Sequence, residues 1–171
     1  MTILETERLI LRELQPDDAP FMLELLNEPS YVLNIADRGV RDLDGARRYL
    51  EDRWRASYRQ HGFGLWVVVE RSSGMATGLC GLVRRDGLED VDIGYAFLPA
   101  FWGRGYAIES ALGVKAHARD VVGLTRLVAI VVPSNLPSVR VLERLGMSVE
   151  RTLRLPGEST DLALYAMALH A

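Results

Sequence analysis

The stretch that decides the fold is LPAFWGRGYA, residues 98–107. Pro99 ends a strand-like run, because it has no N–H to donate to a neighbouring strand. Gly103 and Gly105 then flank Arg104, which predicts a tight turn with positive φ and close backbone approach. A helix is expected to follow at once, and its first N–H groups have no partner within the helix. Together with the helix dipole, these groups predict a site for a phosphate or pyrophosphate.

By itself this turn is weak evidence for a phosphate site, because a GxG sequence before a helix is also an ordinary tight turn. Other glycine-rich templates fit the chain poorly. No GxxxxGK[ST] sequence is present, which argues against a P-loop. The run GRGYAIES at 103–110 lacks the third glycine of GxGxxG and follows strands joined by short turns. Both features argue against a dinucleotide-binding Rossmann unit.

The sequence on both sides of the turn predicts a single mixed α/β domain over residues 1–171, without repeats or a linker. Apolar residues at helical spacing predict about four helices, at 17–27, 42–60, 106–118 and 136–145. Pro29 is expected to end the first helix, and residues 30–41 to form a loop. Apolar runs predict about seven strands, at 9–14, 65–70, 77–83, 91–98, 127–132, 147–155 and 161–169.

The order of these elements predicts the topology of the sheet. Short turns between the strands at 65–98 indicate an antiparallel meander. The helix at 106–118 connects two strands as a crossover, which implies at least one parallel pair with a right-handed connection. The predicted fold is therefore α/β, in the α+β sense, with one mostly antiparallel central sheet flanked by helices. The arginines on the polar side of the 42–60 helix are interpreted as a solvent-exposed face; they are Arg47, Arg48, Arg53 and Arg55.

Composition and charge restrict the class of protein. A chain of 171 residues buries about 70% of its unfolded surface, so it needs no metal or disulfide to be stable. The net charge of −3 argues against a general nucleic-acid-binding protein, and no apolar run is long enough to span a membrane. Cys80 is the single cysteine and the histidines are scattered, so neither a disulfide framework nor a metal site is predicted. The N-terminus lacks a signal-peptide pattern, so the expected location is cytoplasmic.

A second signal lies at residues 132–147, VPSNLPSVRVLERLGM, where a strand leads into a short helix. Together the two stretches resemble the GNAT superfamily of N-acetyltransferases. The closer likeness is to its RimJ/RimL-like branch, which acetylates ribosomal-protein N-termini. The first family motif reads [QR]-x-x-G-x-[GA]. Gly105 and Ala107 match its last two defined positions, and Trp102 stands in place of Gln or Arg.

The second family motif, N-x-x-[SA] followed by an apolar helix and Gly-aromatic, is matched at Asn135, Ser138 and Gly146. Met147 stands where an aromatic residue is usual. The opening ETERLILREL and the runs GLCGL and DIGYAF also resemble this branch. The resemblance covers roughly residues 5–169, and it is more specific for the fold and for acyl-CoA binding than for the acceptor.

The resemblance implies that the chain binds acetyl-CoA, without a metal, on a sheet that contains one splayed parallel pair. The backbone of the glycine turn would bind the CoA pyrophosphate, and Asn135 and the strand edge would bind the pantetheine arm. Arg104 would add a cation, and Trp102 would shield the cofactor. The implied cofactor-binding residues are Phe97, Leu98, Trp102, Gly103, Arg104, Gly105, Tyr106, Ala107 and Asn135.

The family's usual reaction is direct attack of a free amine on the thioester, without a covalent acyl-enzyme. Many members place a tyrosine acid seven residues after the motif asparagine, but this chain has Leu142 there. By resemblance to the ribosomal-protein branch, Ser138 is the candidate acid near the sulfur; its alternative role is to cap the helix. Asp92 is the candidate base, and its alternative role is that of a half-exposed strand carboxylate. Glu109 is interpreted as structural.

The acceptor groove is expected between the loop at 30–41 and the last hairpin, near 154–161. Its candidate substrate-binding residues are Tyr31, Leu33, Asn34, Arg38 and Arg154. Their mixed charges favour a protein or peptide N-terminal α-amine, whose pKa of about 8 also demands little of a base. Two alternatives stay open: a small-molecule amine such as an amino acid, polyamine or antibiotic, and a non-catalytic acyl-CoA-binding module. Direct contact with nucleic acid or membrane is not expected, and a homodimer is left open.

Overall fold

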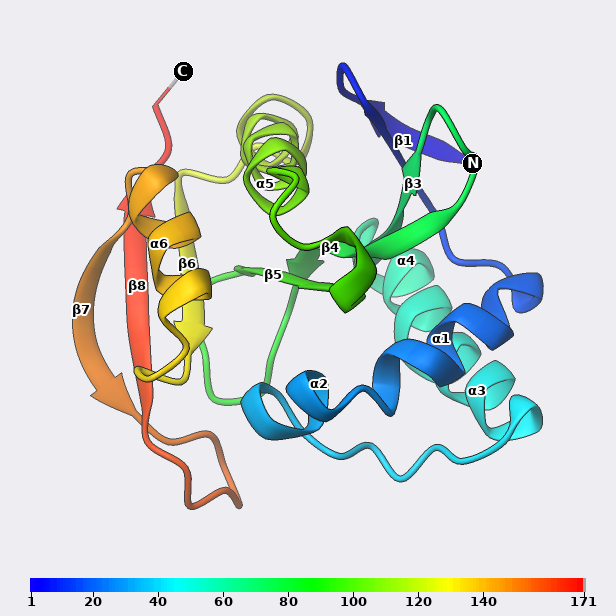
Figure 1. The fold of residues 1–171 in the computed structure, drawn as a ribbon. Helices are drawn as coiled ribbons and strands as arrows, with labels where there is room; N and C mark the ends of the chain where they lie inside the picture. The colour runs from blue at the N-terminus through cyan, green and yellow to red at the C-terminus, as the bar shows by residue number, and fades with distance from the viewer. Residues whose placement is uncertain (171) are drawn as a thin grey trace.

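The computed structural model describes residues 1–170, and its single sheet has eight strands in the order β1-β2-β3-β4-β5-β6-β8-β7 (Figure 1). Neighbouring strands are antiparallel except for β5 and β6, which are parallel. The mostly antiparallel α/β fold predicted from the sequence is therefore confirmed. The strands are β1 (Thr2–Glu5), β2 (Leu9–Arg12), β3 (Leu65–Glu70), β4 (Ala76–Val83), β5 (Asp92–Phe97), β6 (Arg126–Val131), β7 (Ser148–Leu153) and β8 (Leu162–Ala168).

Helices cover both faces of the sheet, and Figure 1 shows α5 above its centre and the α1–α4 helices below it. Ser110 of α5 faces Cys80 of β4. Successive residues of a strand face opposite sides of the sheet, so the next residue of β4, Gly81, belongs to the other face. Its strand partner Leu65 lines a pocket together with Trp54, which comes from the helical segment Leu50–Arg55 on that side. The helices are α1 (Ala19–Leu26), α2 (Pro29–Asn34), α3 (Leu43–Tyr49), α4 (Ala56–His61), α5 (Tyr106–His117) and α6 (Leu136–Arg144). None of those within residues 1–170 has the length and hydropathy needed to cross a bilayer.

The N-terminal region differs from the prediction, because it contains two strands where the sequence predicted one. Residues Thr2–Glu5 form β1, which pairs with β2 through partners such as Glu5 and Ile10. β1 is a short edge strand whose outer residues are exposed. Its apolar pattern is therefore too brief to separate it from the strand that follows.

The predicted loop at 30–41 is also wrong in its first half, where α2 spans Pro29–Asn34. Pro29 begins this helix, whereas the sequence analysis used it only to end the helix before. Proline suits the first turn of a helix, because the N–H that it lacks would have no partner there. As a result, Tyr31 is held in a helix and buried instead of lying in an open loop.

One long helical segment has an irregular winding that the sequence did not indicate. α3 and α4 are continuous through Leu50–Arg55, which has the wider π-type turn. A π-type turn shifts every later side chain around the helix axis relative to the ordinary 3.6-residue period. The solvent-exposed face predicted for Arg53 is wrong: this side chain is half-buried, follows Leu50 by three residues on the same face, and lines the pocket described below.

The parallel pair at the centre of the sheet opens almost at once. β5 and β6 share a single register position, Asp92 with Val128, and the Val128 N–H donates to the Val91 carbonyl at 3.1 Å. Beyond this point β5 remains paired only with β4, up to Phe97. The edge of β5 that would face β6 is therefore left without strand partners and borders a cleft.

Candidate active site

The glycine turn between β5 and α5 has the backbone conformation that the sequence predicted. Gly103 has a φ of 75° and Gly105 has a φ of 78°, both in the left-handed region that glycine adopts without strain. Gly105 is the N-cap of α5, so the first N–H groups of that helix lie free at the turn. A Cβ at Gly105 would lie 3.4 Å from Nη2 of Arg8. The turn thus presents backbone donors in a conformation that disfavours any residue with a side chain.

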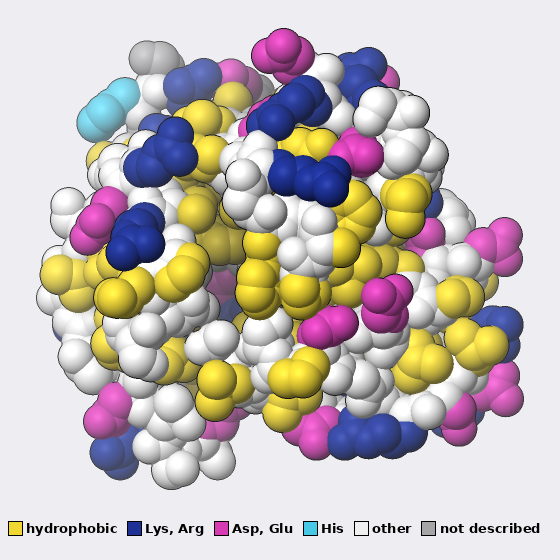
Figure 2. Space-filling view, viewed as in Figure 1, with side chains coloured by type: hydrophobic (Ala, Val, Ile, Leu, Met, Phe, Trp, Pro, Cys, Tyr) yellow, Lys and Arg dark blue, Asp and Glu magenta, His cyan; other side chains and the backbone are white. Residues whose placement is uncertain are grey.

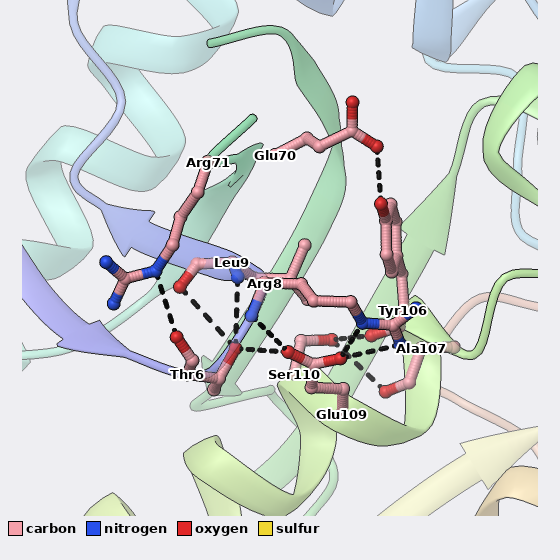
Figure 3. A network of polar contacts seen from close by, with 9 residues as sticks. All are labelled: Thr6, Arg8, Leu9, Glu70, Arg71, Tyr106, Ala107, Glu109 and Ser110. Atoms are coloured by element: carbon pink, nitrogen blue, oxygen red, sulfur yellow. Dashed lines mark hydrogen bonds and ion pairs between the residues drawn. The ribbon is translucent and has the colours of Figure 1, made fainter. Parts of the chain in front are cut away.

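The side chains around this turn form a polar network, shown in Figure 3. Glu70, at the end of β3, accepts hydrogen bonds from the Tyr106 hydroxyl and, at 3.1 Å, from Nη1 of Arg104. The hydroxyls of Tyr106 and Ser73 hold the pKa of Glu70 below its ordinary value, so this carboxylate is ionised. Arg104 uses one of its five N–H donors for Glu70 and is about half exposed, so it and the backbone N–H groups of the turn both have donors free for a phosphate.

Glu109 belongs to the same network and anchors α5 to the N-terminal hairpin. Its carboxylate accepts a hydrogen bond from Thr6 Oγ1 at 2.7 Å and pairs with Arg8 Nη2 at 2.6 Å. The guanidinium of Arg8 in turn lies 4.8 Å from the centre of the Tyr106 ring. All these partners hold the helix in place, which agrees with the structural role predicted for Glu109.

Trp102 connects the glycine turn to the end of β5. Its indole Nε1 donates to the backbone carbonyl of Phe97 at 2.9 Å, while 55% of the residue stays exposed. The neighbouring Leu98 is buried, and its N–H donates to the Thr77 carbonyl at 2.9 Å. The strand end and the turn are thereby fixed relative to each other.

Ser138 lies in the first turn of α6 and is joined to a tyrosine that the sequence analysis missed. The hydroxyl of Tyr95 lies 3.0 Å from both the Oγ atom and the carbonyl oxygen of Ser138, and its single proton is donated to one of the two at a time. No side-chain capping bond is present at Asn135, the N-cap of α6. Burial raises the pKa of Tyr95, so its hydroxyl keeps its proton. The motif DIGYAF contained this residue, but nothing local indicated its contact with α6.

Asp92 is the one buried carboxylate between the splayed strands. Only 1% of the residue is exposed, so its alternative interpretation as a half-exposed strand carboxylate is wrong. Arg85 Nε donates to its Oδ2 at 2.5 Å, whereas its Oδ1 is buried without a hydrogen-bond partner. Burial raises the pKa of Asp92, although Arg85 and Arg53 oppose the shift. A carboxylate with a raised pKa and a free oxygen is suited to accept a proton.

Asp92, Tyr95 and Ser138 all line one pocket of about 170 Å³ in the cleft between β5 and β6. Figure 2 shows the cleft as a hollow between the β6, β8 and α6 side and the rest of the molecule. α2, the segment after it and the β7–β8 connection also contribute lining residues. Of the sequence-predicted residues, the pocket brings together Tyr31, Asn34, Arg38, Asp92, Asn135 and Ser138.

Two residues proposed for the acceptor groove lie apart from this lining. Arg154 is exposed and pairs with Asp161 at 2.6 Å. Leu33 points to solvent with 80% of its surface exposed. Conversely, the lining contains charged and aromatic residues that the sequence analysis did not select; they are Arg53, Trp54 and Arg85. These come from segments far apart in the sequence, so no local motif marked them.

Comparison with known proteins identifies this arrangement. Residues 8–148 match the family model described as the acetyltransferase (GNAT) domain. The chain belongs to the GNAT acetyltransferase family. YkkB of Bacillus subtilis is 29% identical over 157 residues, which cover 90% of this chain and 89% of YkkB. The structure of an acetyltransferase from Agrobacterium tumefaciens C58 is similar with a TM-score of 0.82 and 26% identity, covering 98% of this chain and 94% of that one.

The structure of RimL, a ribosomal L7/L12 α-N-protein acetyltransferase in complex with coenzyme A, shares the fold with a TM-score of 0.81. Its identity is 18%, and the match covers 99% of this chain and 98% of that one. As a GNAT acetyltransferase, the chain uses acetyl-CoA as acetyl donor. The free backbone donors at the start of α5, next to two glycines with positive φ, fit a CoA pyrophosphate at the turn. Among residues 1–170, no three His, Cys, Asp or Glu side chains gather as a metal site would require.

Proposed function

We propose that this GNAT acetyltransferase transfers the acetyl group to the α-amine of a peptide or protein N-terminus, as in the RimJ/RimL-like branch, by direct attack. The observation that carries the proposal is the placement of two chemical groups on opposite faces of β5. Asp92 and Tyr95 are three residues apart, so strand alternation sends their side chains to opposite sides of the sheet. The cleft beside β5 connects the two faces of the sheet. The acceptor amine would enter from the side of Asp92, the thioester would enter from the side of Tyr95 and Ser138, and the two would meet in the cleft.

Asp92 acts in this proposal as the base. Its unpartnered Oδ1 accepts the proton of the acceptor ammonium, and Arg85 holds Oδ2 so that the carboxylate keeps its orientation. An α-amine has an ordinary pKa of about 8 and a lysine one of about 10.4. A carboxylate with a raised pKa therefore matches an α-amine better than a lysine side chain.

On the face of β5 opposite Asp92, the hydroxyls of Ser138 and Tyr95 act together as the hydrogen-bond donor to the leaving group. The Ser138 hydroxyl donates a hydrogen bond to the leaving sulfur, while the Tyr95 hydroxyl turns its single proton from the Ser138 carbonyl to Ser138 Oγ. Tyr95 keeps its proton because burial raises its pKa. The pair replaces the tyrosine that many family members have at the position of Leu142, which is buried here.

Acetyl-CoA supplies the activated acetyl group when it is bound. The backbone of residues 103–107 would hold its pyrophosphate, and the free edge of β5 with Asn135 would hold the pantetheine arm. Trp102 keeps the turn attached to the end of β5 through the Phe97 carbonyl. Arg104 supports the turn through Glu70 and would add a cation beside the pyrophosphate.

A small amine is the second candidate acceptor, and the enclosure of the pocket favours it. α2 and the β7–β8 connection both contribute lining residues, among them Tyr31 and Glu158, so the acceptor side is walled rather than flat. The third alternative, a non-catalytic module, leaves the buried free oxygen of Asp92 without a role.

Thiol release from acetyl-CoA tests the proposal. The panel contains peptides with a free α-amine, the same peptides with a blocked α-amine and a free lysine, and small amines. We expect turnover of the free peptides and its loss on blocking. Turnover of small amines alone would replace the proposal by the second candidate. Saturable acetyl-CoA binding without turnover of any amine would favour the non-catalytic module.

A further inference from the structure

One wall of the acceptor pocket is rich in hydrogen-bond donors that have no acceptor. Arg38 Nε, Arg53 Nε and Trp54 Nε1 are buried and have no hydrogen-bond partner within residues 1–170. All three residues line the pocket that contains Asp92. Buried polar groups in folded proteins are nearly always paired, so three unpaired donors on one wall call for a ligand that accepts hydrogen bonds.

The charges of the residues on this wall also favour a ligand that accepts hydrogen bonds. Among the described residues, no carboxylate lies within 4 Å of the guanidinium nitrogens of Arg38 or Arg53, whereas Arg85 is already paired with Asp92. Burial lowers the pKa of Arg53, and the nearby positive charges of Arg38 and Arg85 lower it further. Glu158 also lines the pocket and favours the charged form of Arg38, but it forms no ion pair with it within 4 Å. The lining therefore has three arginines, Arg38, Arg53 and Arg85, against the two carboxylates of Asp92 and Glu158, which leaves an excess of positive charge.

Neutral neighbours do not relieve this charge. Tyr49 lies close enough to influence both arginines, but burial raises its pKa to about 12, so it supplies no negative charge at neutral pH. The Arg53 guanidinium stacks on Trp54, with 4.7 Å between its central carbon and the ring centroid. Stacking of this kind positions a guanidinium and leaves its N–H edge available to an oxyanion.

The same pocket holds one unpaired acceptor, the Asp92 Oδ1 atom, next to this donor-rich wall. A ligand that satisfies both sides has an ammonium or amine for the carboxylate and an oxyanion for the guanidinium groups. Guanidinium forks bind carboxylates and phosphonates through paired hydrogen bonds.

We propose that the acceptor is an amine that also carries an oxyanion, a carboxylate or a phosphonate, which Arg38 and Arg53 hold while the amine faces Asp92. The binding of the amine at Asp92 rests on the proposed function. The binding of the oxyanion rests only on the unpaired donors of the pocket wall. Two sources share this chemistry: a free amino acid or aminophosphonate, and a peptide with an acidic residue at its first or second position. A polyamine has no group for the arginines to bind.

Matched acceptor pairs test the proposal with the full-length protein. The pairs are amino acids and their amides, peptides with Asp or Glu against Asn or Gln at the first two positions, and 2-aminoethylphosphonate against ethanolamine. We expect the anionic member of the favoured pair to have a kcat/KM about 10- to 100-fold higher, mostly through KM. The pair in which this preference occurs identifies the source.

Substitutions of Arg38 and Arg53 test whether the preference for anionic acceptors comes from this wall of the pocket. Arg53→Gln and Arg38→Gln should each bring the ratio of anionic to neutral kcat/KM toward one, and Arg53→Lys should keep part of it. Arg48→Gln, an exposed position on α3 outside this pocket, is the matched control and should leave the ratio as it is. Two independent arginine variants keep the test valid if one of them does not fold.

A binding measurement separates failure of this proposal from failure of the proposed function. Calorimetry with CoA present compares the N-acetylated acids with the N-acetylated amides and needs no turnover. Turnover with equal kcat/KM for both members of every pair would overturn the oxyanion proposal alone, and so would a preference that survives in both arginine variants. Tighter binding of the acids that is lost in those variants, without turnover of any amine, would support the oxyanion site and overturn the enzymatic function.

Discussion

The two ends of the cleft are built in different ways. The cofactor end is one continuous turn, residues 98–107, whose functional groups are backbone N–H donors between Gly103 and the start of α5. The acceptor end is assembled from side chains of α2, the Leu50–Arg55 segment, β5 and the β7–β8 connection. The first depends on local conformation, and the second depends on how distant segments pack.

This difference explains why one end indicates its chemistry in the sequence and the other does not. A backbone site requires glycine where a side chain would crowd it, so it leaves a readable motif. A side-chain site needs only that Asp92, Arg53 and Arg38 meet in space, and their spacing along the chain carries no signal. Substitutions at the two ends should therefore separate cofactor binding from acceptor chemistry.

The largest effect is expected at the turn, where Gly105→Glu should abolish acetyl-CoA binding. The φ of 78° disfavours any side chain, the new Cβ would lie 3.4 Å from Arg8 Nη2, and the carboxylate would repel a phosphate. Calorimetric titration measures the loss. Gly123→Glu is the matched control, since Gly123 has a φ of 81° with nothing within 4 Å of its Cβ position. Unchanged affinity in Gly105→Glu would place the pyrophosphate elsewhere.

Asp92→Asn should reduce kcat/KM by about 100-fold at pH values above the raised pKa of Asp92 and well below the pKa of the acceptor amine, and by less as the pH approaches the pKa of that amine. Without its base, the variant reacts only with the fraction of amine that is already neutral, and this fraction grows with pH. A pH–rate profile for both proteins measures the effect. A constant ratio across pH would remove Asp92 as the base.

The same substitution, which lowers activity, should raise the stability of the folded protein at pH values where Asp92 is ionised. Because burial raises the pKa of Asp92 in the folded state, ionising it costs stability. The wild type should therefore lose stability relative to Asp92→Asn as the pH rises from about 4 through the raised pKa. Thermal denaturation across this window checks the sign and shows that the variant is folded.

A smaller effect is expected for the donor pair on the other face. Ser138→Ala and Tyr95→Phe should each lower kcat by about tenfold, with little change in acetyl-CoA affinity. Because the two hydroxyls lie 3.0 Å apart and act in series, the double variant should be no worse than the poorer single one. Steady-state kinetics of all three variants provide the measurement. Multiplicative losses would mean that the hydroxyls act independently.

The smallest effect should come from Trp102→Phe, which removes the hydrogen bond to the Phe97 carbonyl and keeps an aromatic ring. Such a bond contributes about 1 kcal/mol net, so the Kd for acetyl-CoA should rise by about fivefold. The kcat at saturating acetyl-CoA should stay close to the wild-type value. A change in kcat with an unchanged Kd would instead connect Trp102 to the acceptor end.

Prediction from the sequence succeeded where the signal is local and failed where it is not. The positive φ at Gly103 and Gly105 followed from the glycine spacing alone, and the mixed sheet followed from hydrophobic periodicity. α2 was missed because Pro29 ends one helix and begins another equally well. Arg53 was assigned to solvent because it is charged, although Tyr49 and Leu50 precede it by four and three residues and so share its helix face.

The sequence by itself determined the sheet class, the glycine turn and the family resemblance, because each depends on residues close together in the chain. Only the tertiary structure decided that Asp92 is buried with a free oxygen and that Tyr95 reaches Ser138, 43 residues away. The structure alone also placed the unpaired donors of Arg38 and Arg53 in the pocket that contains Asp92. Burial and unpaired hydrogen-bonding groups are properties of packed surroundings, and those surroundings exist only once distant segments have come together.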